Sequence, residues 1–159
     1  MDKKEILARV DHTLLDPTAG WEDIRRVLDD ALHYGTASAC IPPAYVRQAA
    51  EQVEGLLPIC TVIGFPNGYS TVAVKTFEAA AAVQDGADEI DMVLNIGLLK
   101  AHRDAEVQAE IMMVHDSCRG KLVKVIIETC LLTEEEKIRA CHLVTEAGAE
   151  YIKTSTGFS

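Results

Sequence analysis

The sequence Tyr151-Ile-Lys-Thr-Ser-Thr-Gly-Phe-Ser159 joins a predicted strand to a predicted turn. Tyr151 and Ile152 favour a β-strand, and the Thr-Ser-Thr-Gly run at 154–157 supplies the hydroxyl groups and backbone N–H donors that are typical of turns. Lys153 therefore lies at the carboxyl end of a strand, where parallel α/β folds place their functional sites. Most lysines are solvated surface charges, but this context makes Lys153 a candidate catalytic residue.

The rest of the chain alternates predicted strands with predicted helices, without a linker or a low-complexity segment. Strands are predicted at residues 11–15, 36–41, 57–65, 88–94, 121–129 and 150–155. Helices are predicted at residues 2–10, 21–34, 42–53, 70–84 and 102–117, and between the capping box at 133–136 and Gly148. This alternation favours an α/β fold with a parallel sheet.

Three of the predicted helices end at a glycine, and a side chain of interest stands five residues beyond each one. The pairs are Gly35 and Cys40, Gly86 and Asp91, and Gly148 and Lys153. If the three turns are alike, these side chains lie at equal depth on predicted strands two, four and six. In a (β/α)8 barrel, alternate strands contribute one layer of inward side chains. Asp91 and Lys153 would then share a layer, unless the spacing reflects only a common loop length, which leaves the inward direction open.

Five segments, in the same order, resemble the deoxyribose-phosphate aldolases. They are ASACIPPAYV at 37–46, VIGFPNG at 62–68, GADEIDMVLNIG at 86–97, LVKVIIETCLLT at 122–133 and KTSTGF at 153–158. The resemblance implies a single TIM (β/α)8 barrel domain over residues 1–159. Relatives continue for roughly two more βα units of about 30 residues each, so we expect a C-terminally incomplete barrel with about six of the eight units. We also expect unpaired edges on its first and last strands.

The resemblance implies a class I aldolase that reversibly cleaves 2-deoxy-D-ribose 5-phosphate to D-glyceraldehyde 3-phosphate and acetaldehyde. Lys153 would form the Schiff base, and Asp91 would be the proton donor and acceptor. At an unperturbed pKa of about 10.4, only about one lysine in 2,500 is neutral at pH 7, and a nearby carboxylate raises that pKa further. In the family, a second lysine on the following strand offsets this effect. Lys124 lies inside the predicted strand at 121–129 and is a possible modulator of the Lys153 pKa.

Several other residues have two interpretations each. Thr154, Ser155 and Thr156 are candidates for binding substrate hydroxyls, or they cap a following helix. Cys40 lines the pocket or packs as a small buried thiol. Glu128 is a second interior carboxylate or forms a salt bridge with Lys124. No cofactor is expected, because the protonated imine is itself the electron sink, and the five histidines show no metal-ligand spacing.

Composition limits the possible partners. The formal net charge of −10 argues against nucleic acid or an anionic membrane as the main partner. The five cysteines are odd in number and form no C-x-x-C pair, which is typical of a reduced cytoplasmic protein and not of a disulfide scaffold or a zinc site. No apolar run approaches the length of a membrane span. The expected partners are a sugar phosphate, a small aldehyde and further copies of the chain.

Two alternatives remain open at this point. One is another Schiff-base barrel enzyme, such as a transaldolase, against which the ordered match of five segments argues. The other is a truncated barrel that is inactive or serves in assembly. Fold analogy alone does not choose among them, because this barrel supports many chemistries.

Overall fold

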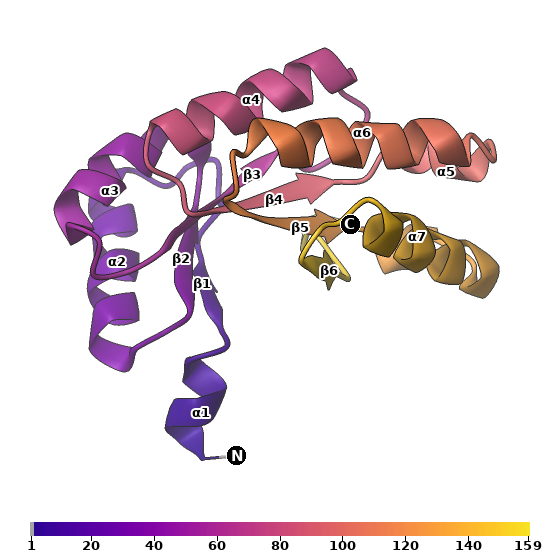
Figure 1. Ribbon diagram of the computed structural model, residues 1–159. Coiled ribbons are helices and arrows are strands. Elements are labelled where there is room, and N and C mark those ends of the chain that lie inside the picture. The colour runs from indigo at the N-terminus through magenta and orange to yellow at the C-terminus, as the bar shows by residue number, and fades with distance from the viewer. Residues whose placement is uncertain (1) are drawn as a thin grey trace.

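Six parallel strands form one continuous sheet in the computed structural model, which describes residues 2–159. Each strand pairs with the next one along the chain, so the sheet order is β1-β2-β3-β4-β5-β6. The strands are β1 (Asp11–Thr13), β2 (Ser38–Ile41), β3 (Ile59–Ile63), β4 (Glu89–Val93), β5 (Leu122–Ile126) and β6 (Tyr151–Lys153). This arrangement is the sequential parallel order of a (β/α)8 barrel, present here as six βα units that curl into a half-barrel (Figure 1).

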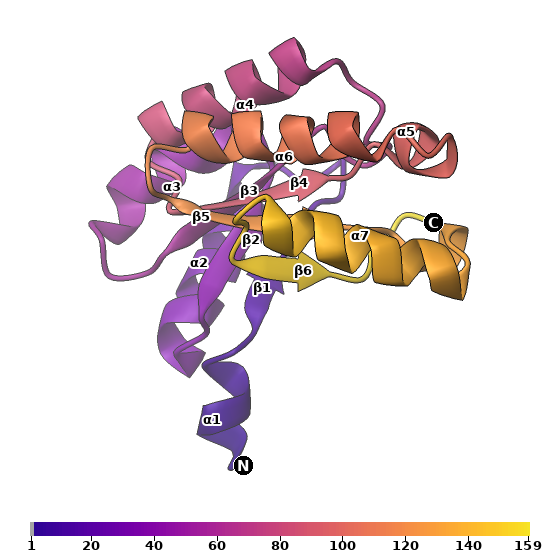
Figure 2. The ribbon, with the colours of Figure 1, turned by 45° about the vertical axis from the view of Figure 1, so that its right-hand side comes forward.

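Helices lie between successive strands and cover the convex side of the curled sheet, except for the first helix, which precedes β1 and extends away from the start of that strand (Figures 1 and 2). They are α1 (Lys3–Leu7), α2 (Trp21–Tyr34), α3 (Val46–Val53), α4 (Val72–Gln84), α5 (Ile96–Lys100), α6 (Asp104–Ser117) and α7 (Glu134–Glu146), with 3-10 turns at Pro43–Tyr45 and Thr129–Leu131. The capping box predicted at 133–136 is present, and Asp2 forms a second one at the start of α1. Gly35 ends α2 in the left-handed conformation. No helix within residues 2–159 is long and apolar enough to cross a membrane.

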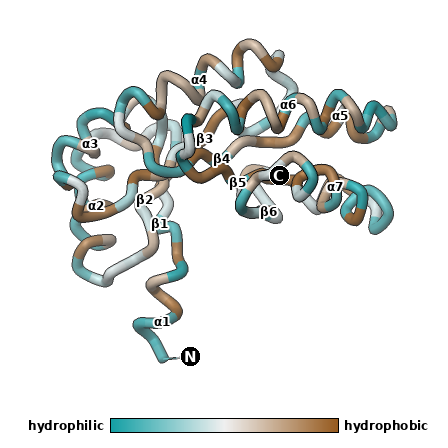
Figure 3. Tube along the Cα trace, viewed as in Figure 1, coloured by the Kyte–Doolittle hydropathy of each residue, from teal (hydrophilic) through white to brown (hydrophobic). Residues whose placement is uncertain are grey.

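The main hydrophobic core lies between this helical layer and the outer face of the sheet. It includes Ile24 and Leu28 of α2 with Ile90 and Met92 of β4, all of them fully buried. Hydrophobic residues accordingly concentrate along the central strands, as the colouring of Figure 3 shows. The inner face of the sheet has only a small apolar cluster around Cys40, Cys60 and Val62, so its remaining interior is available for polar groups.

The predicted alternation of strands and helices is confirmed, with three corrections. The segment at 42–53 opens with a 3-10 turn before α3, because two prolines remove backbone donors from its first turn. The segment at 102–117 begins only at Asp104, and α5 precedes it as a separate short helix that was not predicted. Asn95 caps that helix by accepting a hydrogen bond from Leu98 N at 3.2 Å. The strands are also shorter than predicted, since their apolar ends belong to the connecting turns.

The strand register is staggered as a barrel requires. Cys40 pairs with Cys60, whereas Asp91 on β4 pairs with Val62, two residues further along β3. A closed barrel with eight strands and a shear of eight advances about one residue per strand, and this register follows that rule. Cys40, Asp91 and Lys153, which the glycine spacing identified on alternate strands, therefore lie at equal depth in the sheet.

Candidate active site

Lys153 and Asp91 meet on the inner face of the sheet. Lys153 is the last residue of β6, and Asp91 is the central residue of β4. The Nζ of Lys153 lies 2.5 Å from Oδ2 of Asp91. The Asp91 side chain is only 1% exposed, whereas that of Lys153 is 29% exposed. The pair therefore combines a buried carboxylate with an amine that remains accessible to a small molecule.

Lys124 extends this pair into a network of alternating charges. It lies on β5 beside Asp91 in the sheet register, and its Nζ is 3.2 Å from Asp91 Oδ1. The same ammonium forms ion pairs with Asp11 of β1 at 2.8 Å and with Glu89 of β4 at 2.5 Å. Asp11 Oδ2 also lies 3.2 Å from Lys153 Nζ. Asp11 therefore joins both lysines across the width of the half-barrel.

The network holds its lysines in the charged form. Burial alone would lower the pKa of Lys153, but the charge of Asp91 and its hydrogen bond outweigh burial and raise that pKa above its ordinary value of 10.5. Lys124 acts in the opposite sense, since its positive charge lowers the pKa of Lys153. Burial would likewise lower the pKa of Lys124, which its anionic surroundings raise instead. Burial works to raise the pKa of Asp11, and the hydrogen bond and charge of Lys124 reverse the effect and lower it.

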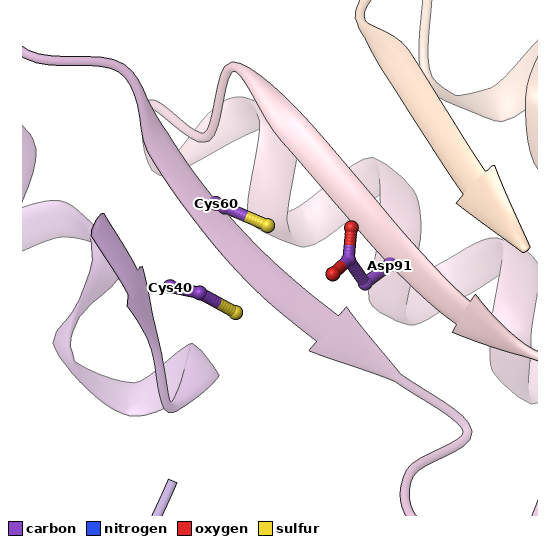
Figure 4. A group of neighbouring side chains, drawn as sticks. All are labelled: Cys40, Cys60 and Asp91. Carbon is purple, nitrogen blue, oxygen red and sulfur yellow. The ribbon is translucent and has the colours of Figure 1, made fainter. Parts of the chain in front are cut away.

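The layer of side chains expected from the glycine spacing is present. Cys40 of β2 and Asp91 of β4 approach each other on the inner face, and Cys60 of β3 joins them although the spacing did not predict it (Figure 4). One sulfur from each cysteine and one oxygen of Asp91 all lie within 4.8 Å of one another. Lys153 completes the layer through its contact with Asp91. Cys40 is 1% exposed and packs with Val62, so its position agrees with a buried thiol at the wall of the site.

The turn after Lys153 is held by Glu128 rather than left free. Glu128 is 2% exposed and has a positive φ of 50°. It accepts hydrogen bonds from the backbone N–H of Thr156 at 3.2 Å and from the Thr156 hydroxyl. The expected salt bridge between Glu128 and Lys124 is therefore wrong, because Glu128 lies beyond the end of β5 and its side chain reaches the turn instead. Thr154 and Ser155 are exposed.

A cavity of about 340 Å3 opens beside this turn, at the carboxyl ends of the strands. Its lining includes Pro66 and Asn67 from the turn after β3, Asn95 after β4, and Glu128 after β5. Gly68 belongs to the same turn and has a φ of 74°, and a Cβ at this position would collide with the backbone oxygen of Leu94. Only glycine allows the turn to approach Leu94 this closely. Three of the segments that carry the family resemblance, 62–68, 86–97 and 122–133, meet at this cavity.

Two members of the network, Asp11 and Glu89, did not emerge from the sequence. Each lies at the first position of its strand, where side-chain direction follows only from the strand register. The signal that could have identified them is parity, because Glu89 and Asp91 are two residues apart and point to the same face. Asp11 belongs to a strand of three residues, which is too short for any alternation to be visible.

The chain resembles aldolases in sequence and in structure. Residues 4–159 match the DeoC/LacD family aldolase profile. The chain is 57% identical over all 159 residues to the deoxyribose-phosphate aldolase of Streptococcus pyogenes serotype M28 (strain MGAS6180), of which it covers 71%. It superimposes with a TM-score of 0.89 on the tetrameric deoxyribose phosphate aldolase of Aeropyrum pernix, at 33% identity, covering 98% of this chain and 66% of that one. A crystal structure described as a deoxyribose-phosphate aldolase from Coccidioides immitis gives a TM-score of 0.97 at 38% identity. The match covers 100% of this chain and 63% of that one.

Proposed function

Since the chain belongs to the DeoC/LacD family of aldolases, we propose that its site performs the class I aldol reaction of 2-deoxy-D-ribose 5-phosphate. Lys153 is the Schiff-base nucleophile, and Asp91 transfers protons. The observation that carries this proposal is the contact of 2.5 Å between Lys153 Nζ and Asp91 Oδ2 at the inner face of the sheet. The substrates are then a sugar phosphate in one direction, and acetaldehyde with glyceraldehyde 3-phosphate in the other.

In the cleavage direction, the free amine of Lys153 attacks the C1 aldehyde of the open-chain sugar, and water leaves as the imine forms. The protonated imine draws electrons from the C2–C3 bond when the C3 hydroxyl loses its proton. That bond breaks, glyceraldehyde 3-phosphate departs, and an enamine remains on Lys153. Protonation of the enamine carbon and hydrolysis then release acetaldehyde and restore the amine.

Asp91 is the base and acid for these proton transfers, either directly or through a water. Its carboxylate is buried and fixed between two ammonium groups, with Lys153 at Oδ2 and Lys124 at Oδ1. Lys124 opposes the rise in the pKa of Lys153, because two positive charges in one network repel each other. We therefore assign Lys124 as a modulator of the Lys153 pKa, acting through charge and not through contact with substrate.

Two regions near the pair are candidates for substrate contacts. The hydroxyls of Thr154 and Ser155 are exposed at the turn after β6, while Thr156 is engaged with Glu128. We therefore assign substrate hydroxyls to Thr154 and Ser155, and assign Thr156 to holding the turn. Cys40 forms part of the buried wall.

Reductive trapping tests the nucleophile directly. Acetaldehyde and borohydride should add a two-carbon group to the peptide that carries Lys153, and Lys153→Ala should abolish that label. Lys137→Ala is the matched control, because Lys137 lies on α7 and pairs only with the exposed Glu134. Labelling of the active-site peptide that persists in Lys153→Ala, or labelling that falls equally in Lys137→Ala, would reject Lys153 as the nucleophile.

We also propose that the protein is a cytoplasmic homo-oligomer. The tetrameric relative from Aeropyrum pernix supports this assignment, and so does the free cysteine content, since all five thiols are unpaired in the structure.

A further inference from the structure

Two buried cysteines and one buried carboxylate converge on the inner face of the sheet. Cys40 lies on β2, Cys60 on β3 and Asp91 on β4. Figure 4 shows the two thiols on the same face, with the carboxylate pointing back toward Cys60. The exposed fractions of the three residues are 1%, 0% and 1%. The cysteines are 20 positions apart in the sequence, so no short cysteine motif predicts that they meet. The pairing of β2 with β3 brings them together.

The distances suit a small tetrahedral ion. One sulfur from each cysteine and one carboxylate oxygen all lie within 4.8 Å of one another. Three ligands placed about 2.3 Å from a tetrahedral ion lie about 3.8 Å apart. The side chains would therefore have to close by about 1 Å or less, which small rotations about χ1 can supply, and a water molecule could take the fourth position.

One oxygen of Asp91 accepts no hydrogen bond. Among the residues that the structure describes, Asp91 Oδ1 is one of four buried side-chain atoms without a hydrogen-bond partner. It is instead an ion-pair neighbour of Lys124 Nζ at 3.2 Å. A cation that binds Asp91 would exchange this ionic contact for a coordinate bond.

The charge of the surroundings also permits a divalent cation. Three carboxylates and two ammonium groups form the network, giving it a net charge of −1; they are Asp11, Glu89, Asp91, Lys124 and Lys153. When a divalent ion binds, each thiol gives one proton to solvent as its S–H bond is replaced by a bond to the metal. Two protons leave and two positive charges arrive, so the net charge of the cluster stays the same.

We propose that Cys40, Cys60 and Asp91 form a binding site for one thiophilic divalent cation of the zinc and cadmium class. Two sulfur ligands select borderline and soft ions over Mg2+ and Ca2+, which prefer oxygen. Lys124 Nζ lies 3.5 Å from Cys60 Sγ, and its ion pairs with Asp11 and Glu89 give it other carboxylate partners. Because Asp91 also holds Lys153, a bound cation competes with that lysine for one carboxylate.

Titration of the reduced 159-residue protein with Cd2+ tests the site without any measurement of activity. Calorimetry and the sulfur-to-cadmium absorption band should report one Cd2+ per chain. Cys40→Ala and Cys60→Ala should each weaken binding at least 10-fold, by analogy with the 10–100-fold effect of changes around metal ligands. The matched controls are Cys130→Ala and Cys141→Ala, whose side chains are more exposed and should leave the affinity unchanged. Mg2+ should give no signal.

Cadmium X-ray absorption on the Cys130→Ala/Cys141→Ala protein keeps the test decisive if either inner-face variant fails to fold. The spectrum should show two sulfur neighbours together with oxygen. Three results would each overturn the proposal: no binding at all, unchanged affinity in Cys40→Ala or Cys60→Ala, or a Cd2+ with fewer than two sulfur neighbours.

Discussion

The carboxylates that surround Lys153 conflict with its proposed role as a nucleophile. A nucleophilic amine must be neutral, but the charges of Asp91 and Asp11 raise the pKa of this lysine above 10.5. Lys124 works against them, although its own charge is shared among three carboxylates. The arrangement secures the position of the amine at the expense of its reactivity at neutral pH.

The rate of imine trapping should therefore rise with pH. For a lysine with a raised pKa, the reactive fraction increases about tenfold per pH unit until the pH exceeds that pKa, so the rate should still be rising at pH 10. Borohydride trapping with acetaldehyde between pH 6 and pH 10.5 would measure it, with Lys137 peptides as an internal reference. A plateau near pH 7 would show that the amine of Lys153 is already free there.

Asp91→Asn should separate proton transfer from stability. Loss of a general acid and base costs roughly 10²–10⁴-fold in rate, so cleavage of deoxyribose 5-phosphate should fall by that factor. Both lysines keep other carboxylate partners, Asp11 for Lys153 and Asp11 with Glu89 for Lys124. The melting temperature should therefore stay within a few degrees of the parent. Kinetics and thermal unfolding of the same preparation check both parts, and either retained turnover or a collapse of folding would assign Asp91 a structural role.

Sequence reasoning identified the pair that we propose as reactive, but not the charged residues around it. Lys153 and Asp91 stand at fixed distances from helix-ending glycines, so their equal depth could be predicted, and their contact follows from it. Asp11 and Glu89 were missed because a strand start carries no pattern of its own. For Glu128 the sequence left open a second interior carboxylate or a salt bridge with Lys124, because sequence separation does not show where a residue with a positive φ directs its side chain.

Between elements, α4 and α6 are joined by an ion pair that is entirely enclosed. Lys75 of α4 is 0% exposed, and its Nζ lies 2.9 Å from Glu110 Oε2 and 2.9 Å from the backbone oxygen of Val93. Burial lowers the pKa of Lys75 and raises that of Glu110, so desolvation outweighs the attraction of the pair for each partner. The ion pair therefore contributes more to the positions of α4 and α6 against β4 than to the free energy of unfolding.

Breaking this pair should cost more than removing both partners. Lys75→Met leaves a buried carboxylate without a partner and should lower the free energy of unfolding by about 3–5 kcal/mol, whereas Lys75→Met/Glu110→Leu should lie much closer to the parent. Lys137→Met on α7 is the control at a surface ion pair, in which the side chain of Lys137 is 30% exposed and that of Glu134 is 86% exposed, and it should cost less than about 1 kcal/mol. Urea unfolding measures all three variants, and equal losses in the single and double variants would contradict the argument.

Helix boundaries followed from the sequence where a capping residue defines them, as at Thr133 and Gly35. They did not follow at 95–103, where α5 ends and α6 begins within a few residues. The short helix α5 depends on its cap at Asn95 and on the burial of Leu99, and the second of these contacts is tertiary. Helix propensity alone does not predict a helix of five residues, because so short a helix is not stable without tertiary contacts.

For the whole molecule, the sheet has two edges. Within residues 2–159, β1 pairs only with β2, and β6 pairs only with β5. The edge strand β6 also exposes 56% of Tyr151 and 39% of Ile152. Strand alternation predicted the parallel order from sequence, but the stagger that curls the sheet was visible only in the register. That curl directs the ionised side chains inward while leaving backbone groups of both edge strands unpaired.

A polypeptide of these 159 residues should associate through its edge strands. Unpaired N–H and C=O groups beside exposed apolar side chains template strand addition, so sedimentation at micromolar concentration should show dimers or larger species. Ile152→Lys places a charge on the edge and should shift the distribution toward monomer. Phe77→Lys is the control, because Phe77 on α4 is 75% exposed but lies away from either edge, so it should leave association unchanged. A parent that sediments as a monomer would contradict this prediction. If both variants dissociate equally, association does not run through β6, and the outer surface of the helices would become the interface to examine.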